Sequence, residues 1–190
     1  MASPMDQFED WFALAKASNL PDPNAMHLTT VSVDGWPKNR VVLLKCVDAN
    51  GFVFFTNYRS QKARDMAHNP QVGLTFFWPT LEKQIRIEGL AQPVEASMSD
   101  AYFATRPRDA QLTAWASQQS EPIAGRDPLD AAFVRVSRQF PDTVPRPDDW
   151  GGYCVRPQYM EFWQGRPNRF HDRICYAHTP NGWVISRICP

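Results

Sequence analysis

Residues 27–57 read HLTTVSVDGWPKNRVVLLKCVDANGFVFFTN and contain three apolar runs with two turn signals between them. The runs 27–33, 40–47 and 52–57 are rich in Val, Leu, Thr and Phe, most of which favour strands. Asp34-Gly35 follows the first run and Asn50-Gly51 follows the second, and such dipeptides form the tight turns of β-hairpins. This stretch therefore predicts two successive hairpins.

The rest of the chain extends the sheet and adds helices around it. Further strands are expected at 72–78, 84–91, 153–155, 160–164, 169–176 and 183–188. Apolar residues at helical spacing predict an N-terminal helix at about 6–18, and Ser60 begins a short helix that ends near His68. Pro and Gly separate three more helices, at 97–105, 110–118 and 129–140, which form a helical insert at about 97–140. The pattern predicts a mainly β (α+β) fold, an antiparallel barrel with peripheral helices in one domain over residues 1–190.

Composition and charge exclude several classes of protein. Twenty basic residues balance twenty acidic ones, so no net field favours nucleic acid or an anionic membrane. The acidic N-terminus has no apolar run behind it, and no stretch approaches the roughly 20 apolar residues of a membrane span. The four cysteines form no C-x-x-C pair, which indicates thiols in a reducing cytoplasm.

Familiar catalytic and cofactor motifs are absent from the sequence. It has no G-x-G-x-x-G, P-loop, H-E-x-x-H or G-x-S-x-G motif. The four histidines are scattered without metal-ligand spacing, so no metal site is expected. Seven Trp and twelve Phe are many for this length, and such side chains fill a core or line a ligand pocket.

Cations placed within apolar strands are the first candidates for a binding site. Arg40 and Lys45 bracket four apolar residues, and alternation along a strand would point them to opposite faces. One face of a barrel strand is interior, so one of these cations would need a partner such as a phosphate. The pattern leaves an alternative open, in which both cations lie at strand ends and extend into solvent.

Two helical segments could also hold an anion. The start of the helix after Ser60 carries Lys62, and exposed backbone N–H groups at a helix N-terminus attract anions. Tyr102 and Arg106 stand four residues apart, a spacing that places a phenol and a guanidinium on one helical face. Plain capping and a surface Tyr–Arg pair fit these patterns equally well.

The segment Arg169-Phe170-His171-Asp172-Arg173 carries the strongest signal. In a strand, Arg169, His171 and Arg173 share one face, and three potential cations side by side repel unless an anion or an electron-rich group faces them. A charged edge strand that prevents aggregation is the alternative. Aromatic and apolar neighbours on both sides make an edge position less suitable.

Several short motifs occur in one order along the chain. They are Arg40-Val-Val-Leu-Leu-Lys45, Phe55-Thr56-Asn57, Ser60-Gln-Lys62, Tyr102-Phe-x-x-Arg106-Pro-Arg, Gln119-Ser120, Glu161-Phe-Trp-Gln-Gly165, Arg169-Phe-His-Asp-Arg173 and Arg187-Ile-Cys-Pro190. This ordered set resembles the pyridoxamine 5′-phosphate oxidase family, and the resemblance runs from about Phe8 to Pro190. No single motif is specific, whereas the ordered set is.

The resemblance implies a split β-barrel homodimer with FMN in clefts at the dimer interface. It implies substrate binding by Lys45, Tyr102 and Arg106, with Arg169 and His171 as catalytic residues that flank the substrate ring. The residues that it implies for FMN are Arg40, Val41, Val42, Leu43, Leu44, Lys45, Phe55, Thr56, Gln61, Lys62, Gln84, Gln119, Ser120, Trp163 and Arg173.

The activity implied by the resemblance is oxidation of pyridoxamine and pyridoxine 5′-phosphates to pyridoxal 5′-phosphate, with O2 as acceptor and H2O2 as product. Two alternatives stay open: a related flavin oxidase acting on another heteroaromatic ring such as a phenazine precursor, and a non-catalytic protein that binds flavin or B6 vitamers. The chain departs from the family pattern at Gln61, where Arg is usual, and at Ala110, where a phosphate-binding Ser is usual. It also lacks the basic N-terminal extension that covers the site in some relatives, which puts closure of a lid in doubt.

Overall fold

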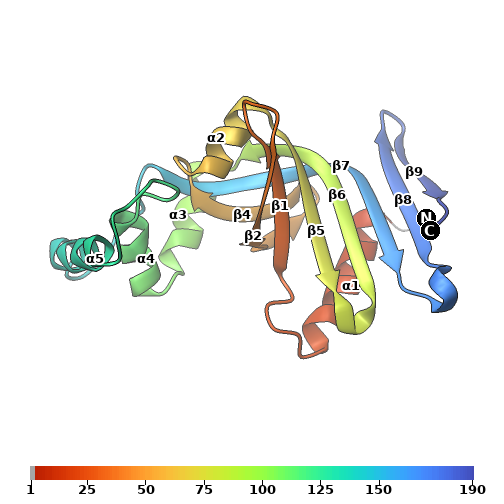
Figure 1. The fold of residues 1–190 in the computed structure, drawn as a ribbon, viewed down its shortest axis with the longest axis horizontal. Helices are drawn as coiled ribbons and strands as arrows, with labels where there is room; N and C mark the ends of the chain where they lie inside the picture. The colour runs from red at the N-terminus through yellow and green to blue at the C-terminus, as the bar shows by residue number, and fades with distance from the viewer. Residues whose placement is uncertain (1–2) are drawn as a thin grey trace.

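The computed structural model describes residues 3–190, and its centre is one antiparallel sheet of nine strands (Figure 1). The strand order is β2-β1-β5-β6-β7-β4-β3, with β8 paired to β7 and β9 paired to β8. The strands are β1 (Ala25–Val31), β2 (Pro37–Leu43), β3 (Cys46–Asp48), β4 (Gly51–Asn57), β5 (Gln71–Trp78), β6 (Lys83–Pro93), β7 (Trp150–Gln164), β8 (Asp172–Thr179) and β9 (Gly182–Arg187). The sheet curls into a half-barrel, which confirms the predicted split-barrel architecture.

Within the described residues 3–190, five α-helices surround the sheet, all close to their predicted positions. They are α1 (Pro4–Ala17), α2 (Gln61–His68), α3 (Ala96–Ala104), α4 (Arg108–Ala116) and α5 (Asp127–Gln139). Helix α1 begins with a capping box between Ser3 and Asp6 and carries Pro4 in its first turn, where a missing N–H costs nothing. No helix within residues 3–190 is long and apolar enough to cross a membrane.

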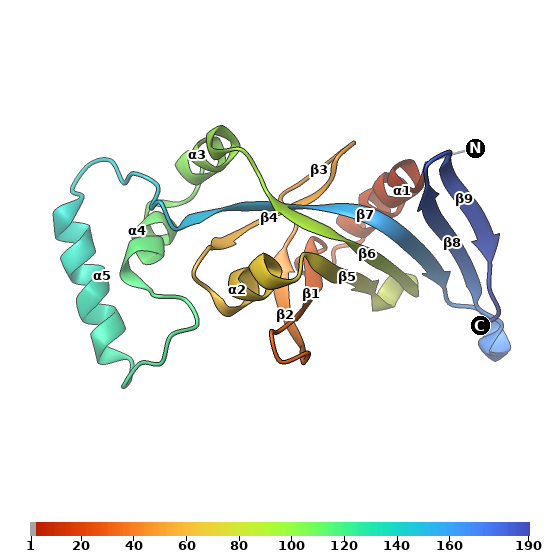
Figure 2. The same cartoon turned by 90° about the horizontal axis from the view of Figure 1, so that it is seen from above.

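Two apolar clusters hold the elements together. In the main core, Phe8 of α1 packs edge-on against Phe52 and Phe76 of the sheet, at ring-centroid distances of 4.8 and 5.2 Å. A smaller cluster, which includes Phe103 and Trp150, joins the helices α3, α4 and α5 to the start of β7. These helices and the β8–β9 hairpin lie at opposite ends of the molecule's long axis (Figures 1 and 2).

The two predicted hairpins are present, but the middle run is not one strand. Strand β2 ends at Leu43 and β3 begins at Cys46, so β1–β2 and β3–β4 are separate hairpins. Between them the backbone N–H of Leu44 bonds to Asn24 O, and the Leu44 side chain turns into the core. The expected continuous strand 40–47 was therefore wrong, because the strand is interrupted before Lys45.

The C-terminal strands differ from expectation in two places. The predicted strands 153–155 and 160–164 form one strand, β7, that runs from Trp150 to Gln164. The predicted strand 169–176 begins only at Asp172, because Pro167–Arg169 form a 3-10 turn in which Asn168 and Arg169 have φ of 58° and 62°. Arg169, His171 and Arg173 therefore do not share one strand face.

Candidate functional site

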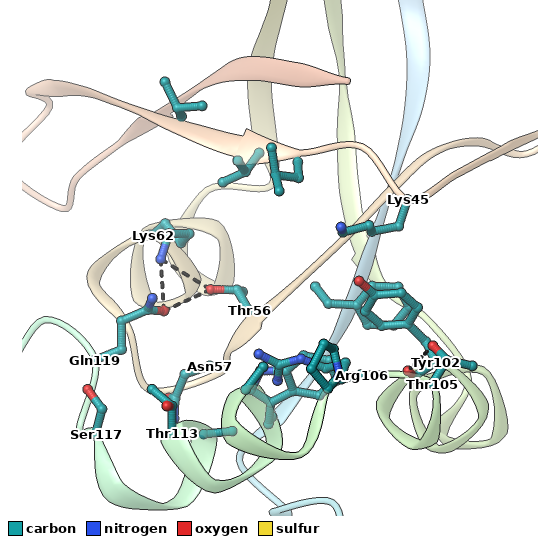
Figure 3. A pocket seen from close by; sticks show the side chains of 18 residues that line it. Lys45, Thr56, Asn57, Lys62, Tyr102, Thr105, Arg106, Thr113, Ser117 and Gln119 are labelled. Atoms are coloured by element: carbon teal, nitrogen blue, oxygen red, sulfur yellow. Dashed lines mark hydrogen bonds between the residues drawn. The ribbon is translucent and has the colours of Figure 1, made fainter. Parts of the chain in front are cut away.

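A cavity of about 530 Å³ opens between β2, β4, α2 and the junction of α3 with α4 (Figure 3). Its volume lies in the usual range for small-molecule sites. Ten of the predicted site residues line it: Val41, Val42, Leu43, Lys45, Phe55, Thr56, Lys62, Tyr102, Arg106 and Gln119. The fold thus brings together segments that lie up to about 80 residues apart in sequence.

Lys62 is a buried cation with neutral partners. Its Nζ donates to Thr56 Oγ1 at 3.1 Å and to Gln119 Oε1 at 3.0 Å, and the residue is 8% exposed (Figure 3). Burial, with a contribution from the positive charge of Arg40, lowers the pKa of Lys62 to about 8. Among residues 3–190 no carboxylate lies within ion-pair distance of Lys62, so a bound anion would stabilise its charged form.

Arg106 presents a second cation to the same cavity. Its guanidinium carbon lies 4.6 Å from the Trp150 ring centroid and 5.6 Å from that of Phe103. One terminal nitrogen, Nη1, is buried and has no hydrogen-bond partner among the described residues. Burial lowers the pKa of Arg106, and leaving a charged donor unsatisfied is costly. Both features make Arg106 a suitable partner for an anion.

Tyr102 and Arg106 line the cavity from different elements. Helix α3 ends at Ala104, because residues before a proline disfavour the helical conformation and Pro107 follows Arg106 directly. The expectation that both residues share one helical face was therefore wrong, although both side chains face the cavity (Figure 3). Ala110 also lines it, at the position where a hydroxyl is usual in the family pattern.

One wall of the cavity is a stack of three aromatic rings. The Phe55 ring lies 4.1 Å from Tyr102 and 5.5 Å from Trp150, and both interplanar angles are below 20°. Gly152, the cross-strand partner of Phe55, makes room for the stack, because a Cβ there would lie 2.8 Å from the Phe55 ring. Lys45 extends over the outer ring, with Nζ 5.7 Å from the Tyr102 centroid.

Arg40 and Gln61 do not line the cavity and instead meet at Asp65. The carboxylate of Asp65 accepts from Thr30 Oγ1 at 2.7 Å and from Gln61 Nε2 at 2.8 Å, and it lies 3.8 Å from Arg40 Nη2. Burial alone would raise the pKa of Asp65, but these hydrogen bonds and the charges of Lys38 and Arg40 hold it below its usual value. The charge of Arg40 is thus balanced within the chain.

Other neighbours of α2 are also engaged. Arg59 pairs with Asp149 at 3.4 Å and Arg64 with Glu121 at 2.8 Å, so neither cation is free to replace the Arg that is usual at position 61. Leu44 is buried in the core, and Ser120 is exposed with φ of 75°. Neither lines the cavity.

The remaining predicted residues form a second group around β6, β7 and β8. Gln84 is the cross-strand partner of Trp163, which is in turn the partner of Arg173. The His171 ring lies 4.7 Å from Trp163, and its Nδ1 accepts the backbone N–H of Arg166 at 3.1 Å. Arg169 precedes this group in the 3-10 turn.

Carboxylates of this chain balance much of the positive charge in the second group. Arg173 donates to both oxygens of Glu161, and Asp172 pairs with Arg166 and Arg187. The expected repulsion among three cations is therefore relieved without a ligand at Arg173. His171 and Arg169 have no acidic partner among residues 3–190.

The two groups lie far apart within one chain. Strand β7 carries Trp150 at the cavity and Trp163 in the second group, and thirteen residues of strand span roughly 40 Å. Figures 1 and 2 show the corresponding ends of β7 on opposite sides of the molecule. One small ligand cannot touch both groups of the same chain.

Sequence reasoning missed several residues that line the cavity, notably Trp150, Thr105 and Thr113. Only Trp150 carried a usable signal, since a Trp directly before Gly151-Gly152 indicates a close approach of other groups to the backbone. No group of three or more His, Cys, Asp or Glu within residues 3–190 is placed to hold a metal ion.

A half-barrel with a cation-lined, aromatic-walled cavity on its flank has the architecture of a split-barrel protein. The chain belongs to the pyridoxamine 5′-phosphate oxidase family. The family model described as pyridoxamine 5′-phosphate oxidase matches residues 15–140, and the one described as pyridoxine 5′-phosphate oxidase C-terminal dimerisation region matches residues 150–190.

Individual relatives cover the whole chain. A pyridoxine/pyridoxamine 5′-phosphate oxidase of Bordetella avium is 51% identical over 190 residues, which is 100% of this chain and 90% of the relative. The crystal structure of PhzG from Burkholderia lata in complex with tetrahydrophenazine-1-carboxylic acid matches with a TM-score of 0.95 at 28% identity, covering 100% of this chain and 94% of PhzG. A pyridoxamine 5′-phosphate oxidase-related, FMN-binding protein of Nostoc punctiforme shares the fold, with a TM-score of 0.79 at 17% identity and full coverage of both chains.

Proposed function

We propose that this protein is an FMN-dependent oxidase that converts pyridoxamine 5′-phosphate and pyridoxine 5′-phosphate to pyridoxal 5′-phosphate, with O2 as the electron acceptor and H2O2 as the product. The observation that carries the proposal is the aromatic-walled cavity lined by Lys45, Lys62 and Arg106, none of which has a carboxylate partner among residues 3–190. Two phosphate groups, one on the cofactor and one on the substrate, would pair with the charges of these side chains. A relative that is 51% identical over the full length of this chain supports the same activity.

The described residues fit FMN. The buried Lys62 with only neutral partners suits a phosphate, while Thr56 and Gln119 offer polar atoms beside it. The β2 residues Val41, Val42 and Leu43, with Phe55, add an apolar and aromatic surface for the ring system. When bound, FMN supplies the two-electron acceptor that O2 reoxidises. We also propose that Arg40 and Gln61, which both bind Asp65, position this side of the FMN site. The remaining contacts to FMN are assigned to Leu44, Gln84, Ser120, Trp163 and Arg173.

The substrate phosphate is assigned to Lys45, Tyr102 and Arg106. A guanidinium with a free donor suits a phosphate oxygen, and the phenol of Tyr102 adds a neutral donor. Arg169 and His171 are assigned to the substrate ring, which they orient and polarise. The fixed acceptor role of His171 Nδ1 leaves Nε2 as the nitrogen free to face the substrate.

We infer a homodimer in which each site takes the cavity from one chain and the second group from its partner. The roughly 40 Å between Trp150 and Trp163 within one chain is the reason, because the two groups cannot meet on one ligand otherwise. In a twofold dimer each chain would contribute both halves, one to each of two sites. The match of residues 150–190 to a C-terminal dimerisation region supports this arrangement.

Two observations bear on the alternatives. The likeness to PhzG favours a split-barrel oxidase acting on another ring, such as a phenazine precursor. The cations of Lys45 and Arg106 beside Tyr102 favour a phosphorylated substrate instead. A non-catalytic flavin or vitamer carrier would have no use for His171 and Arg169. Four free thiols agree with the reducing cytoplasm that we propose as the location.

The test is addition of pyridoxamine 5′-phosphate to the FMN-loaded protein without oxygen. We expect the yellow absorbance of the flavin to bleach and pyridoxal 5′-phosphate to form in equal amount, with colour returning on admission of air. Protein that holds FMN and keeps its colour with this substrate contradicts the proposal. Bleaching by a phenazine precursor alone would favour the second oxidase.

A further inference from the structure

Glu161 is a buried carboxylate near the C-terminal end of β7, and no role assigned so far explains it. It is 2% exposed, and both of its oxygens are bonded. Oε1 accepts from Arg173 Nε at 2.7 Å, while Oε2 accepts from Arg173 Nη2 and from Arg86 Nη1, each at 3.0 Å. Burial of a charged carboxylate destabilises the fold unless charged or hydrogen-bonding partners stay beside it.

The arrangement fixes the plane of one guanidinium. Arg173 grips Glu161 with two parallel N–H bonds, and its Nη1 donates to the backbone oxygen of Cys189 at 3.1 Å. Three of the five donors of Arg173 are thereby used, which leaves two for another group. The hydrogen bonds from Arg173 to Glu161 hold the pKa of Arg173 above its usual value, so it stays charged.

The cluster also carries a defined charge next to the second group of site residues. Arg86 and Arg173 give two positive charges, and Glu161 cancels one. Arg173 is the cross-strand partner of Trp163, whereas Arg86 is half-exposed and also reaches Glu88 at 3.5 Å. The negative charge of Glu161 therefore lowers the positive electrostatic potential at any ligand beside Arg173.

We propose that Glu161 is a positioning residue that orients Arg173 toward the flavin and, by cancelling one positive charge, sets the redox potential of the bound cofactor. This inference rests on the proposed function, because it requires FMN beside Arg173. Reduction adds negative charge to the flavin ring, so more positive surroundings favour the reduced form. Removing the charge of Glu161 and removing the charge of Arg86 should accordingly shift the potential in opposite directions.

The experiment compares three FMN-loaded variants, Glu161→Gln, Arg86→Gln and Glu88→Gln, with the wild type. Each is equilibrated anaerobically with a redox dye, and the ratio of reduced to oxidised flavin is measured at one fixed potential. We expect Glu161→Gln to raise this ratio by about tenfold, the order of magnitude expected when one buried negative charge near the ring is removed at an effective dielectric of about 20. Arg86→Gln should lower it about threefold, because solvent screens this half-exposed side chain.

Glu88→Gln is the matched control, since Glu88 pairs with the same Arg86 but is exposed and does not touch Arg173. Its ratio should stay within about twofold of the wild type. Shifts of Glu161→Gln and Arg86→Gln in the same direction would show a loss of structure and overturn the proposal. So would a shift in Glu161→Gln no larger than that in Glu88→Gln.

The outcomes separate this inference from the proposed function. Wild-type protein that binds no FMN overturns both. Wild-type protein that binds FMN and does not oxidise the substrate overturns the proposed function alone, because the ratio of reduced to oxidised flavin is measured without substrate. Wild-type protein that is active, with a ratio that Glu161→Gln leaves unchanged, overturns the inference alone. If Glu161→Gln does not fold, Arg86→Gln decides: a ratio that does not fall overturns the proposal.

Discussion

Lys62 shows how burial prepares a single side chain for an anion. The fold takes its ammonium group out of water and offers it only the neutral oxygens of Thr56 and Gln119. The resulting pKa of about 8 means that Lys62 of the free protein is mostly charged at neutral pH and mostly neutral above pH 9. If Lys62 holds the FMN phosphate as proposed, its titration links phosphate binding to pH.

We predict that FMN affinity falls as the pH rises through 8. A phosphate favours the protonated Lys62, so binding must take up a proton wherever the free lysine has lost it. The dissociation constant should rise up to about tenfold per pH unit above pH 8, measured by quenching of flavin fluorescence from pH 7 to 9.5. In Lys62→Met binding should be weaker but nearly independent of pH in this range. Equal pH dependence in both proteins would show that another group is responsible.

The Trp150 ring stabilises the Arg106 guanidinium through a cation–π contact. The ring is 4.6 Å from the Arg106 guanidinium carbon and stacks on Phe55. We predict that Trp150→Leu raises the KM for pyridoxamine 5′-phosphate about fivefold to thirtyfold, because a desolvated cation–π contact contributes about 1–2 kcal/mol. The effect on kcat should be smaller.

A double-mutant cycle provides the control for this prediction. In an Arg106→Gln background, Trp150→Leu should change the KM little, because the charge that the ring supports is already gone. Equal effects of Trp150→Leu with and without Arg106 would mean that Trp150 only supports the fold.

At the scale of elements, turn and pattern signals predicted most of the sheet. The dipeptides Asp34-Gly35 and Asn50-Gly51 located the first hairpins correctly, and each helix lies within a few residues of its expected position. Strand β7 was predicted as two separate strands because Pro157 interrupts its pattern. The structure accommodates this proline at a register shift opposite Gly89, where a strand tolerates a residue without an N–H group.

The candidate site was predictable only in part, for a related reason. Ten implied residues do meet at one cavity, since hairpin geometry and the helix after Ser60 place them there. Arg169 was read as the first residue of a strand because charges alternate from Arg169 to Arg173, and its positive φ leaves no trace in such a pattern. Nor does alternation along a strand reveal that Arg173 is paired with Glu161.

The junction of α3 and α4 gives a prediction about substrate affinity. Ala110 lines the cavity two residues after Arg108, in the first turn of α4. Ala110→Ser should lower the KM for pyridoxamine 5′-phosphate several-fold, since a hydrogen bond to a charged group contributes about 1.5–3 kcal/mol before its ordering cost. Ala104→Ser, at the exposed end of α3, is the matched control and should leave the KM unchanged. A KM that does not fall in Ala110→Ser would place the phosphate elsewhere in the cavity.

At the scale of the whole molecule, the long strand β7 separates the two halves of the proposed site. The cavity with Arg106 lies at one end and the group around His171 at the other (Figure 2). A single chain would therefore be inactive by geometry alone, and activity would require two chains arranged about a twofold axis. Pattern analysis cannot detect this, because sequence spacing says nothing about which chain completes a site.

Subunit complementation tests this account most directly. Homodimers of Arg106→Ala and homodimers of His171→Ala should each have little activity, because every site lacks one essential group. After the two variants are unfolded together and refolded in equal amounts, half of the dimers should be mixed, and each mixed dimer should contain one intact site. We predict recovery of about a quarter of the wild-type activity. Activity no higher than that of the separate variants, with mixed dimers demonstrably formed, would contradict a site shared between two chains.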